Sequence, residues 1–289
     1  MDITEELAIG NAEALLKENS ISTLPIDPTY IAKKILDVEV QANPSKEKGV
    51  SGMLLRDGNS FGIVYATYID NPGFQRFSVA HEIGHLVLPG HPDQFSTGPI
   101  AHQSHAGFKG YSDYETEADF FASGLLMPSH LVESILRKHQ EGFQSIQAIK
   151  EACVTSLTAS AIRYTKLTNS IAAIVVSKGN QINYCFMSDQ LKELDGLQWI
   201  SKNTPLPEDS LSKEFNSYPE NVHSAERADS TSHIQDWFGG DYDFELIEEV
   251  VGLGRYGKTL TVLHTEEDPD DDEDELPGMD DIRFRGKYE

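Results

Sequence analysis

The chain has 289 residues, of which 39% are hydrophobic, and a formal net charge of −24. This length allows two domains with cores of ordinary size. The negative charge repels DNA phosphate, so we expect no direct DNA binding and favour a protein partner with a basic surface. Two cysteines exclude a disulfide framework, no apolar run reaches the ~18 residues of a membrane span, and the acidic N-terminal residues do not resemble a signal peptide. We therefore expect a cytoplasmic protein without a membrane anchor.

The first part of the chain predicts helices around a small sheet. Apolar residues at helical spacing, and the helix-start signal Asp27-Pro28, indicate the helices. The predicted helices cover residues 4–18, a segment from 28 onward, 75–88, 113–126, and two or three segments within 129–167. The predicted strands, two of which flank the turn Asp57-Gly58-Asn59, cover residues 38–40, 50–55 and 61–68. Residues 90–110 are expected to form a polar loop.

The second part of the chain predicts two further hairpins. Their strands are expected at residues 171–176, 181–187, 244–251 and 258–264, with the polar residues 202–236 between the hairpins. Gly252, Gly254 and Gly257 match a dinucleotide-binding motif. That motif requires a helix after the glycines, whereas a strand pattern follows here, so we interpret these glycines as a hairpin turn.

The predicted fold class is α+β, with two domains and a tail. We assign residues 1–168 to a mainly helical domain with a small sheet, and residues 169–264 to a smaller α+β domain. Residues 265–289 are expected to be a disordered acidic tail, because eleven acidic side chains lie between 266 and 281.

The sequence His81-Glu82-Ile83-Gly84-His85 indicates a metal site. On a helix, residues four apart lie one above the other, so His81 and His85 can bind one Zn²⁺. Glu82 projects beside the metal, where it can act as the general base in metal-assisted peptide hydrolysis.

A third ligand is needed, and Glu115 is the stronger candidate. Glu115 and Asp119 lie four apart on one helical face, and a carboxylate directed toward a core favours a cation. Asp119 can accept the N–H of a ligand histidine and fix its tautomer. Glu117 is a rival, but it falls off the buried side of the predicted helix.

Two alternatives remain open for these residues. Ser112-x-x-Glu115 matches a capping box, which explains Glu115 without any metal. His91 follows His85 by six residues, the interval that metzincins use for their third ligand. Metzincins need a glycine three residues after the second histidine, and Leu88 stands there instead.

A developing oxyanion needs a donor besides the metal. Tyr111, Tyr114, His102 and His105 lie near the two motifs in sequence, but their spacing does not choose among them.

The motifs resemble the ImmA/IrrE metallopeptidase family. The resemblance is carried by residues 76–85, by the pattern from Glu115 to Pro128, and by the opening residues 24–32. It implies a zincin-like domain with His81, His85 and Glu115 as zinc ligands and Glu82 as base. The asparagine that is common in the second motif is Asp119 here, which can make the same contact. The second domain is similar in outline to the sensor-like, GAF-like domain of some family members.

The resemblance implies a zinc endopeptidase that cuts a helix-turn-helix repressor, in a stress response or in the regulation of a mobile element. The alternative is a non-catalytic, metal-containing binding module that sequesters a repressor or toxin partner. The presence of Glu82 favours catalysis, because zinc binding alone does not need it.

Overall fold

The computed structural model describes residues 4–44, 50–58, 60–92, 100–105 and 113–265; within 100–105, Ser104 alone has a described side chain. The chain forms two compact units, Met1–Ile135 with Ala148–Ser160, and Leu136–Gln147 with Ala161–Glu289. Each unit combines helices with a sheet, which confirms the α+β class. The expected domain ends at residues 168 and 264 stay predictions, and the expected acidic tail lies almost entirely outside the described residues.

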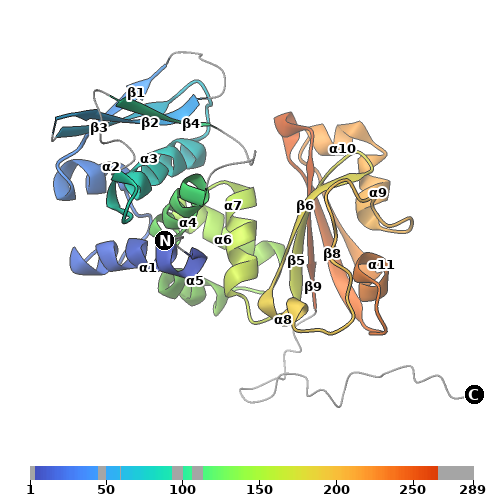
Figure 1. Ribbon diagram of the computed structural model, residues 1–289. Coiled ribbons are helices and arrows are strands. Elements are labelled where there is room, and N and C mark those ends of the chain that lie inside the picture. Colours follow the sequence, from blue (N-terminus) through green and yellow to red (C-terminus); the bar gives the residue numbers. More distant parts are fainter. Residues whose placement is uncertain (1–3, 45–49, 59, 93–99, 106–112, 266–289) are drawn as a thin grey trace, which may run out of the picture. The chain divides into compact units, whose positions relative to one another are not determined.

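The sheet of the first unit has, among the described residues, four strands in the order β1-β3-β2-β4 (Figure 1). These strands are β1 (Glu39–Asn43), β2 (Val50–Asp57), β3 (Ser60–Ala66) and β4 (Ile100–His105). β1 pairs with β3 in parallel, and β2 pairs antiparallel with both β3 and β4. The interpretation of residues 90–110 as a loop was wrong where β4 forms. This strand forms by pairing with β2, which lies some 50 residues earlier in the chain. Its own polar composition does not predict a strand.

The helices of the first unit pack on one another and beneath this sheet (Figure 1). They are α1 (Glu5–Glu18), α2 (Pro28–Tyr30) with the π-helix η1 (Ile31–Ile35), α3 (Pro72–Val87), α4 (Asp113–Leu126) and α5 (Ser129–Leu136). Two helices, α6 (Phe143–Cys153) and α7 (Leu157–Leu167), are shared between the units. Helix α3 contacts β2 and β3 on one side and α4 on the other. It is therefore the central element of the first unit.

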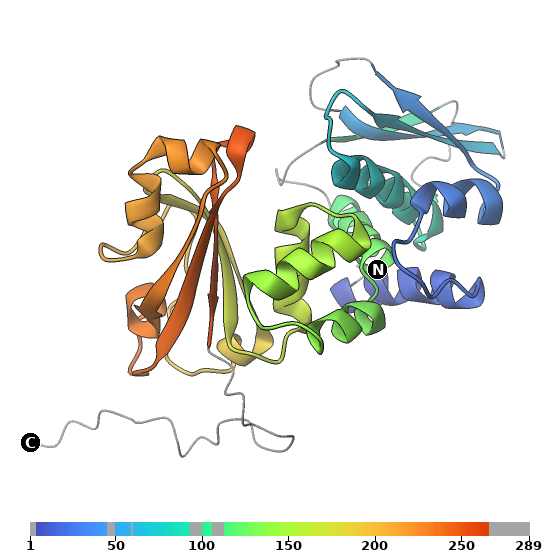
Figure 2. The ribbon, with the colours of Figure 1, turned by 180° about the vertical axis from the view of Figure 1, so that it is seen from behind.

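The second unit contains an antiparallel sheet whose described strands follow the order β6-β5-β9-β8-β7. They are β5 (Ala172–Lys178), β6 (Gln181–Met187), β7 (Arg227–His233), β8 (Glu245–Gly252) and β9 (Thr259–His264). Three short helices lie on one face of the sheet: α9 (Leu211–Asn216), α10 (Pro219–His223) and α11 (Ile234–Phe238) (Figure 2). A fourth, α8 (Asp189–Lys192), follows the end of β6. The segment 202–236 thus holds α9, α10, the edge strand β7 and the start of α11, which its polar composition did not predict.

The glycine-rich turn of the second unit is part of a hairpin, as predicted. β8 and β9 pair antiparallel, and the 3₁₀ turn η3 (Gly254–Tyr256) joins them. A strand follows these glycines, whereas a dinucleotide-binding site needs a helix at that point.

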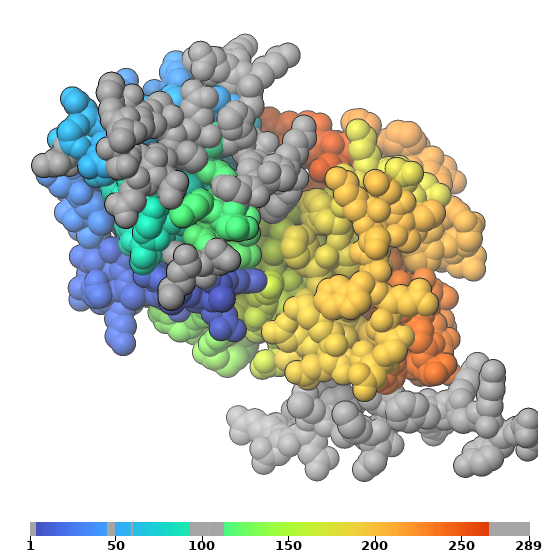
Figure 3. Space-filling view, viewed as in Figure 1, coloured from blue at the N-terminus to red at the C-terminus, as the bar shows by residue number. Residues whose placement is uncertain are grey.

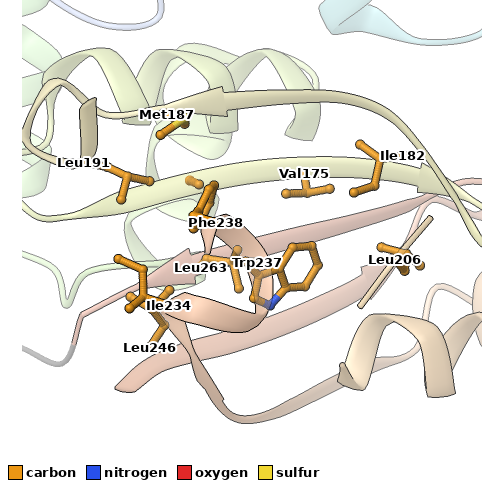
Figure 4. Close-up of a cluster of buried hydrophobic side chains, with 11 residues drawn as sticks. Val175, Ile182, Met187, Leu191, Leu206, Ile234, Trp237, Phe238, Leu246 and Leu263 are labelled. Atoms are coloured by element: carbon orange, nitrogen blue, oxygen red, sulfur yellow. The ribbon is translucent and has the colours of Figure 1, made fainter. Parts of the chain in front are cut away.

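The core of the second unit lies between its sheet and the short helices (Figure 4). Trp237 and Phe238 from α11 pack against strand residues such as Val175 and Leu263. The segment between β6 and α9, yellow in Figure 3, adds partly buried leucines to this core, while Trp199 is 68% exposed. Among the helices in the described part of the chain, none has the length and apolarity needed to cross a membrane.

Candidate metal centre

Two helices bring three potential metal ligands together. His81 and His85 come from α3, and Glu115 comes from the first turn of α4. The Nε2 atoms of the two histidines lie 3.0 Å apart. Nε2 of His81 lies 3.4 Å from Glu115 Oε2, and Nε2 of His85 lies 3.3 Å from Glu115 Oε1. One donor atom from each residue fits within 4.8 Å of the others, so all three can bind a single ion.

The position of α3 follows from local signals. The side chain of Asn71 caps the helix by accepting a hydrogen bond from the backbone N–H of Phe74, and Pro72 occupies the first turn. Gly84 lets α4 approach closely: a β-carbon there would lie 3.2 Å from Cα of Ala118 and 3.2 Å from the Phe121 ring. This close crossing places the first turn of α4 opposite the two histidines.

His81 is held by two carboxylates. Its Nδ1 lies 2.8 Å from Oδ1 of Asp119, on the ring edge opposite the nitrogen that faces Glu115. Burial lowers the pKa of His81, but hydrogen bonds with Asp119 and Glu115, together with the negative charges of Glu82 and Asp119, outweigh burial and raise the pKa to about 10. The surroundings therefore favour a positive charge at this point. Two imidazole nitrogens and one carboxylate are a donor set that suits a catalytic zinc ion.

Glu82 lies on the sheet side of α3 and is fully buried. The hydroxyl of Ser104 in β4 donates a hydrogen bond to its Oε1 across 2.7 Å. Gly52 pairs with Ser104 across β2 and β4, and a β-carbon on Gly52 would lie 2.5 Å from the same oxygen. The sheet thus makes space for the carboxylate and fixes it. Ser104 lies in the segment expected to be a loop, so the sequence did not single it out.

His91 does not join the three donor groups. It is buried, its Nδ1 lies 3.1 Å from Nδ1 of His85, and its Nε2 lies 2.7 Å from Oε2 of Glu117. Burial lowers the pKa of His91, and the hydrogen bond with Glu117 opposes that effect only in part. The expectation that Glu117 falls off the buried side of α4 was wrong, since the residue is 5% exposed. Helical spacing placed it at the margin of the apolar stripe, and His91 supplies the polar partner that allows its burial.

The structure describes only some of the residues considered as hydrogen-bond donors to the developing oxyanion. Tyr114 lies edge-on to the His91 ring, with 4.8 Å between the ring centroids, and is 37% exposed. Tyr111 lies outside the described residues, as do the side chains of His102 and His105 and the Ser112 of the capping-box pattern.

Comparison with known families agrees with this site. Residues 33–152 match the Peptidase_M78 model, described as the IrrE N-terminal-like domain. This segment contains α3, β4 and α4, so the chain carries an IrrE N-terminal-like domain and the resemblance noted from the motifs is confirmed. The match to this domain supports a peptidase role for the chain.

The wider comparisons inform on the fold alone. A search of curated proteins finds no match. Among solved structures, a Mycobacterium tuberculosis transcriptional regulator is similar, with a TM-score of 0.57 over 90% of this chain and 75% of that chain, at 11% sequence identity.

Proposed function

We propose that the chain is a zinc-dependent endopeptidase that cuts a protein partner. The observation that carries this proposal is the convergence of His81, His85 and Glu115 on one point, with the buried Glu82 held beside them by Ser104. The Peptidase_M78 match supports a peptidase role for the domain that holds these residues.

Each residue has a distinct role in the proposed reaction. His81, His85 and Glu115 would hold the ion, and Asp119 would fix the ring of His81 through its Nδ1–H. Zinc, when bound, would supply Lewis-acid activation of water and of the peptide carbonyl. Glu82 would hold the proton removed from water at its carboxylate and pass it to the leaving amine. Ser104 would keep that carboxylate aligned.

We propose a helix-turn-helix transcriptional repressor as the substrate. The family resemblance supports this choice, and the structural neighbour is itself a transcriptional regulator. The net charge of −24 favours a basic partner protein over direct contact with DNA. Cleavage of the repressor would then switch on genes of a stress response or of a mobile element.

The second unit would regulate the peptidase. Its five described strands and short covering helices are compatible with a sensor-like, GAF-like role, and we propose that role for residues 169–264. Both cysteines are free, which fits the reducing cytoplasm that we propose as its location.

The competing function is a binding module that sequesters the partner without cutting it. Glu82→Gln separates the two, because glutamine keeps the size and polarity of the side chain but cannot act as a base. We expect the variant to bind zinc as the wild type does and to trap the uncut partner during co-purification. If Glu82→Gln still gave the full biological response, the endopeptidase hypothesis would be wrong and the binding-module hypothesis would take its place.

A further inference from the structure

A second set of polar groups lies behind the candidate ligand His85. Nδ1 of His85 lies 3.1 Å from Nδ1 of His91, and Nε2 of His91 lies 2.7 Å from Oε2 of Glu117. All three residues are at most 5% exposed. A line of hydrogen bonds therefore runs from His85 through His91 to a buried carboxylate on α4.

The direction of these hydrogen bonds follows from the chemistry of the groups. A carboxylate only accepts, so Nε2 of His91 must carry the proton in its contact with Glu117. In the neutral ring of His91, Nδ1 is then an acceptor, and the proton between the two histidines belongs to Nδ1 of His85. That tautomer leaves the lone pair of His85 on Nε2, the nitrogen that faces His81 and Glu115.

We propose that His91 and Glu117 are positioning residues that hold His85 in the tautomer and orientation needed to bind the metal. The proposal rests on the metal centre proposed above, and it adds two residues that the family motifs do not assign to the site. It also explains why His91 is buried beside a ligand without belonging to the ligand set.

The two candidate histidine ligands are thus supported in different ways. Nδ1 of His81 meets Asp119 directly, and the Asp119 side chain is 29% exposed. The carboxylate that supports His85 is one imidazole further away, and its side chain is 6% exposed. Water can therefore replace part of the Asp119 contact but has little access to the His85–His91–Glu117 line.

The test measures zinc affinity of the full-length protein by competition with a chelator. His91→Phe keeps a ring of similar shape but removes both nitrogens, and Glu117→Leu removes the acceptor. We expect each to weaken zinc binding by roughly 10–100-fold, the range for partners of metal ligands. His91→Gln offers one acceptor and one donor at the end of its side chain, so its affinity should lie closer to the wild type than to His91→Phe.

A matched control separates this role from general stability. Glu13 on α1 accepts hydrogen bonds from the backbone N–H and hydroxyl of Ser129, away from the ligands. Glu13→Gln and Glu117→Gln both weaken a hydrogen-bonded carboxylate site and should both lower the melting temperature, but only Glu117→Gln should alter zinc affinity. In ¹⁵N-labelled wild type, histidine ring spectra should show protons on Nδ1 of His85 and Nε2 of His91 when zinc is bound.

The outcomes distinguish the possible failures. Wild-type affinity in His91→Phe would overturn the positioning role, as would equal losses in His91→Phe and His91→Gln, which would assign His91 to packing. A wild-type protein that binds no zinc would refute the metal centre itself, and the positioning role with it.

Discussion

The hydroxyl of Ser104 and the carboxylate of Glu82 form a buried hydrogen bond of 2.7 Å between the edge strand β4 and the central helix α3. The bond joins the sheet to the residue proposed as general base. The backbone of Ser104 also accepts a hydrogen bond from the hydroxyl of Ser51 in β2, which fixes its place at the sheet edge. Alignment of the base therefore depends on correct pairing of β4.

Ser104→Ala should slow peptide cleavage without loss of zinc. A hydrogen bond to a charged group contributes about 1.5–3 kcal/mol, so we expect turnover to fall roughly tenfold to a hundredfold. Ser78→Ala is the matched control, since among the described residues the Ser78 hydroxyl donates its hydrogen bond to the backbone carbonyl of Phe74 in the same helix. The measurement is the cleavage rate of the partner trapped by Glu82→Gln. Equal rates for Ser104→Ala and wild type would show that the base is aligned by other contacts.

Substitution of each candidate ligand in turn should show which side chains bind zinc. We expect about one Zn²⁺ per wild-type chain by elemental analysis, and loss of bound zinc in His81→Ala, His85→Ala and Glu115→Ala. His91→Ala should still reach one equivalent at saturating zinc, because the three donor groups remain. Asp119→Ala should also retain the ion, with affinity or activity reduced about 10–100-fold. A Glu115→Ala protein with full zinc, together with a zinc-free His91→Ala protein, would contradict this ligand set.

Gly84→Ala should destabilise the first unit and weaken zinc binding. The added β-carbon would meet the backbone of Ala118, which belongs to α4 and cannot yield as a side-chain tip would. Overpacking of this kind typically costs about 1–3 kcal/mol, more than the ~0.5–1 kcal/mol that alanine contributes to helix stability. Displacement of α4 would also move Glu115.

Gly10→Ala is the opposite case for the same substitution. Gly10 lies in α1, and a β-carbon there would meet nothing within 4 Å, so we expect the variant to be about 0.5–1 kcal/mol more stable. Thermal melting checks both glycine variants. A Gly84→Ala variant that is more stable than the wild type would contradict the prediction, because it would show that α3 and α4 can move apart at little cost.

His264 should make the stability of the second unit depend on pH. Burial lowers its pKa, but the hydrogen bonds with Glu249 and the backbone of Thr265, together with the negative charge of Glu249, outweigh burial, so the pKa is raised above its usual 6.5. Glu141 adds to this effect, while Arg227 lies 3.9 Å from the other oxygen of Glu249. A raised pKa means that the protonated form stabilises the folded state. This stabilisation is complete below the unfolded pKa of about 6.5 and is lost as pH rises through the folded value.

The comparison of wild type with His264→Gln isolates this contribution. The difference in unfolding free energy between the two proteins should be largest at pH 6 and should shrink toward alkaline pH. Chemical denaturation at a series of pH values provides the measurement. A difference that grows with pH would reverse the sign and show that His264 is buried in its neutral form.

Local patterns predicted much of the fold. Helix α4 spans Asp113–Leu126, as the apolar spacing indicated, and α3 spans Pro72–Val87, close to the predicted residues 75–88. The hairpins β2–β3, β5–β6 and β8–β9 were also predicted, because a turn and its two strands lie close together in sequence. The strands β4 and β7 were missed. Both are polar edge strands without alternating apolar residues, and β4 pairs with a strand that lies far from it in the sequence.

The sequence by itself determined the pairing of His81 with His85 and the place of Glu82 between them, because the helical repeat of 3.6 residues sets these relations locally. It also favoured Glu115 over Glu117 and His91 as the third ligand, but helical spacing alone left these alternatives open. Only the tertiary structure decided where these side chains lie: the close crossing of α3 and α4 at Gly84 brings Glu115 to the two histidines, and Glu117 contacts His91. The pairing of β4 with β2 likewise supplied Ser104 to Glu82. Such contacts depend on how elements far apart in the chain pack, which no local periodicity encodes.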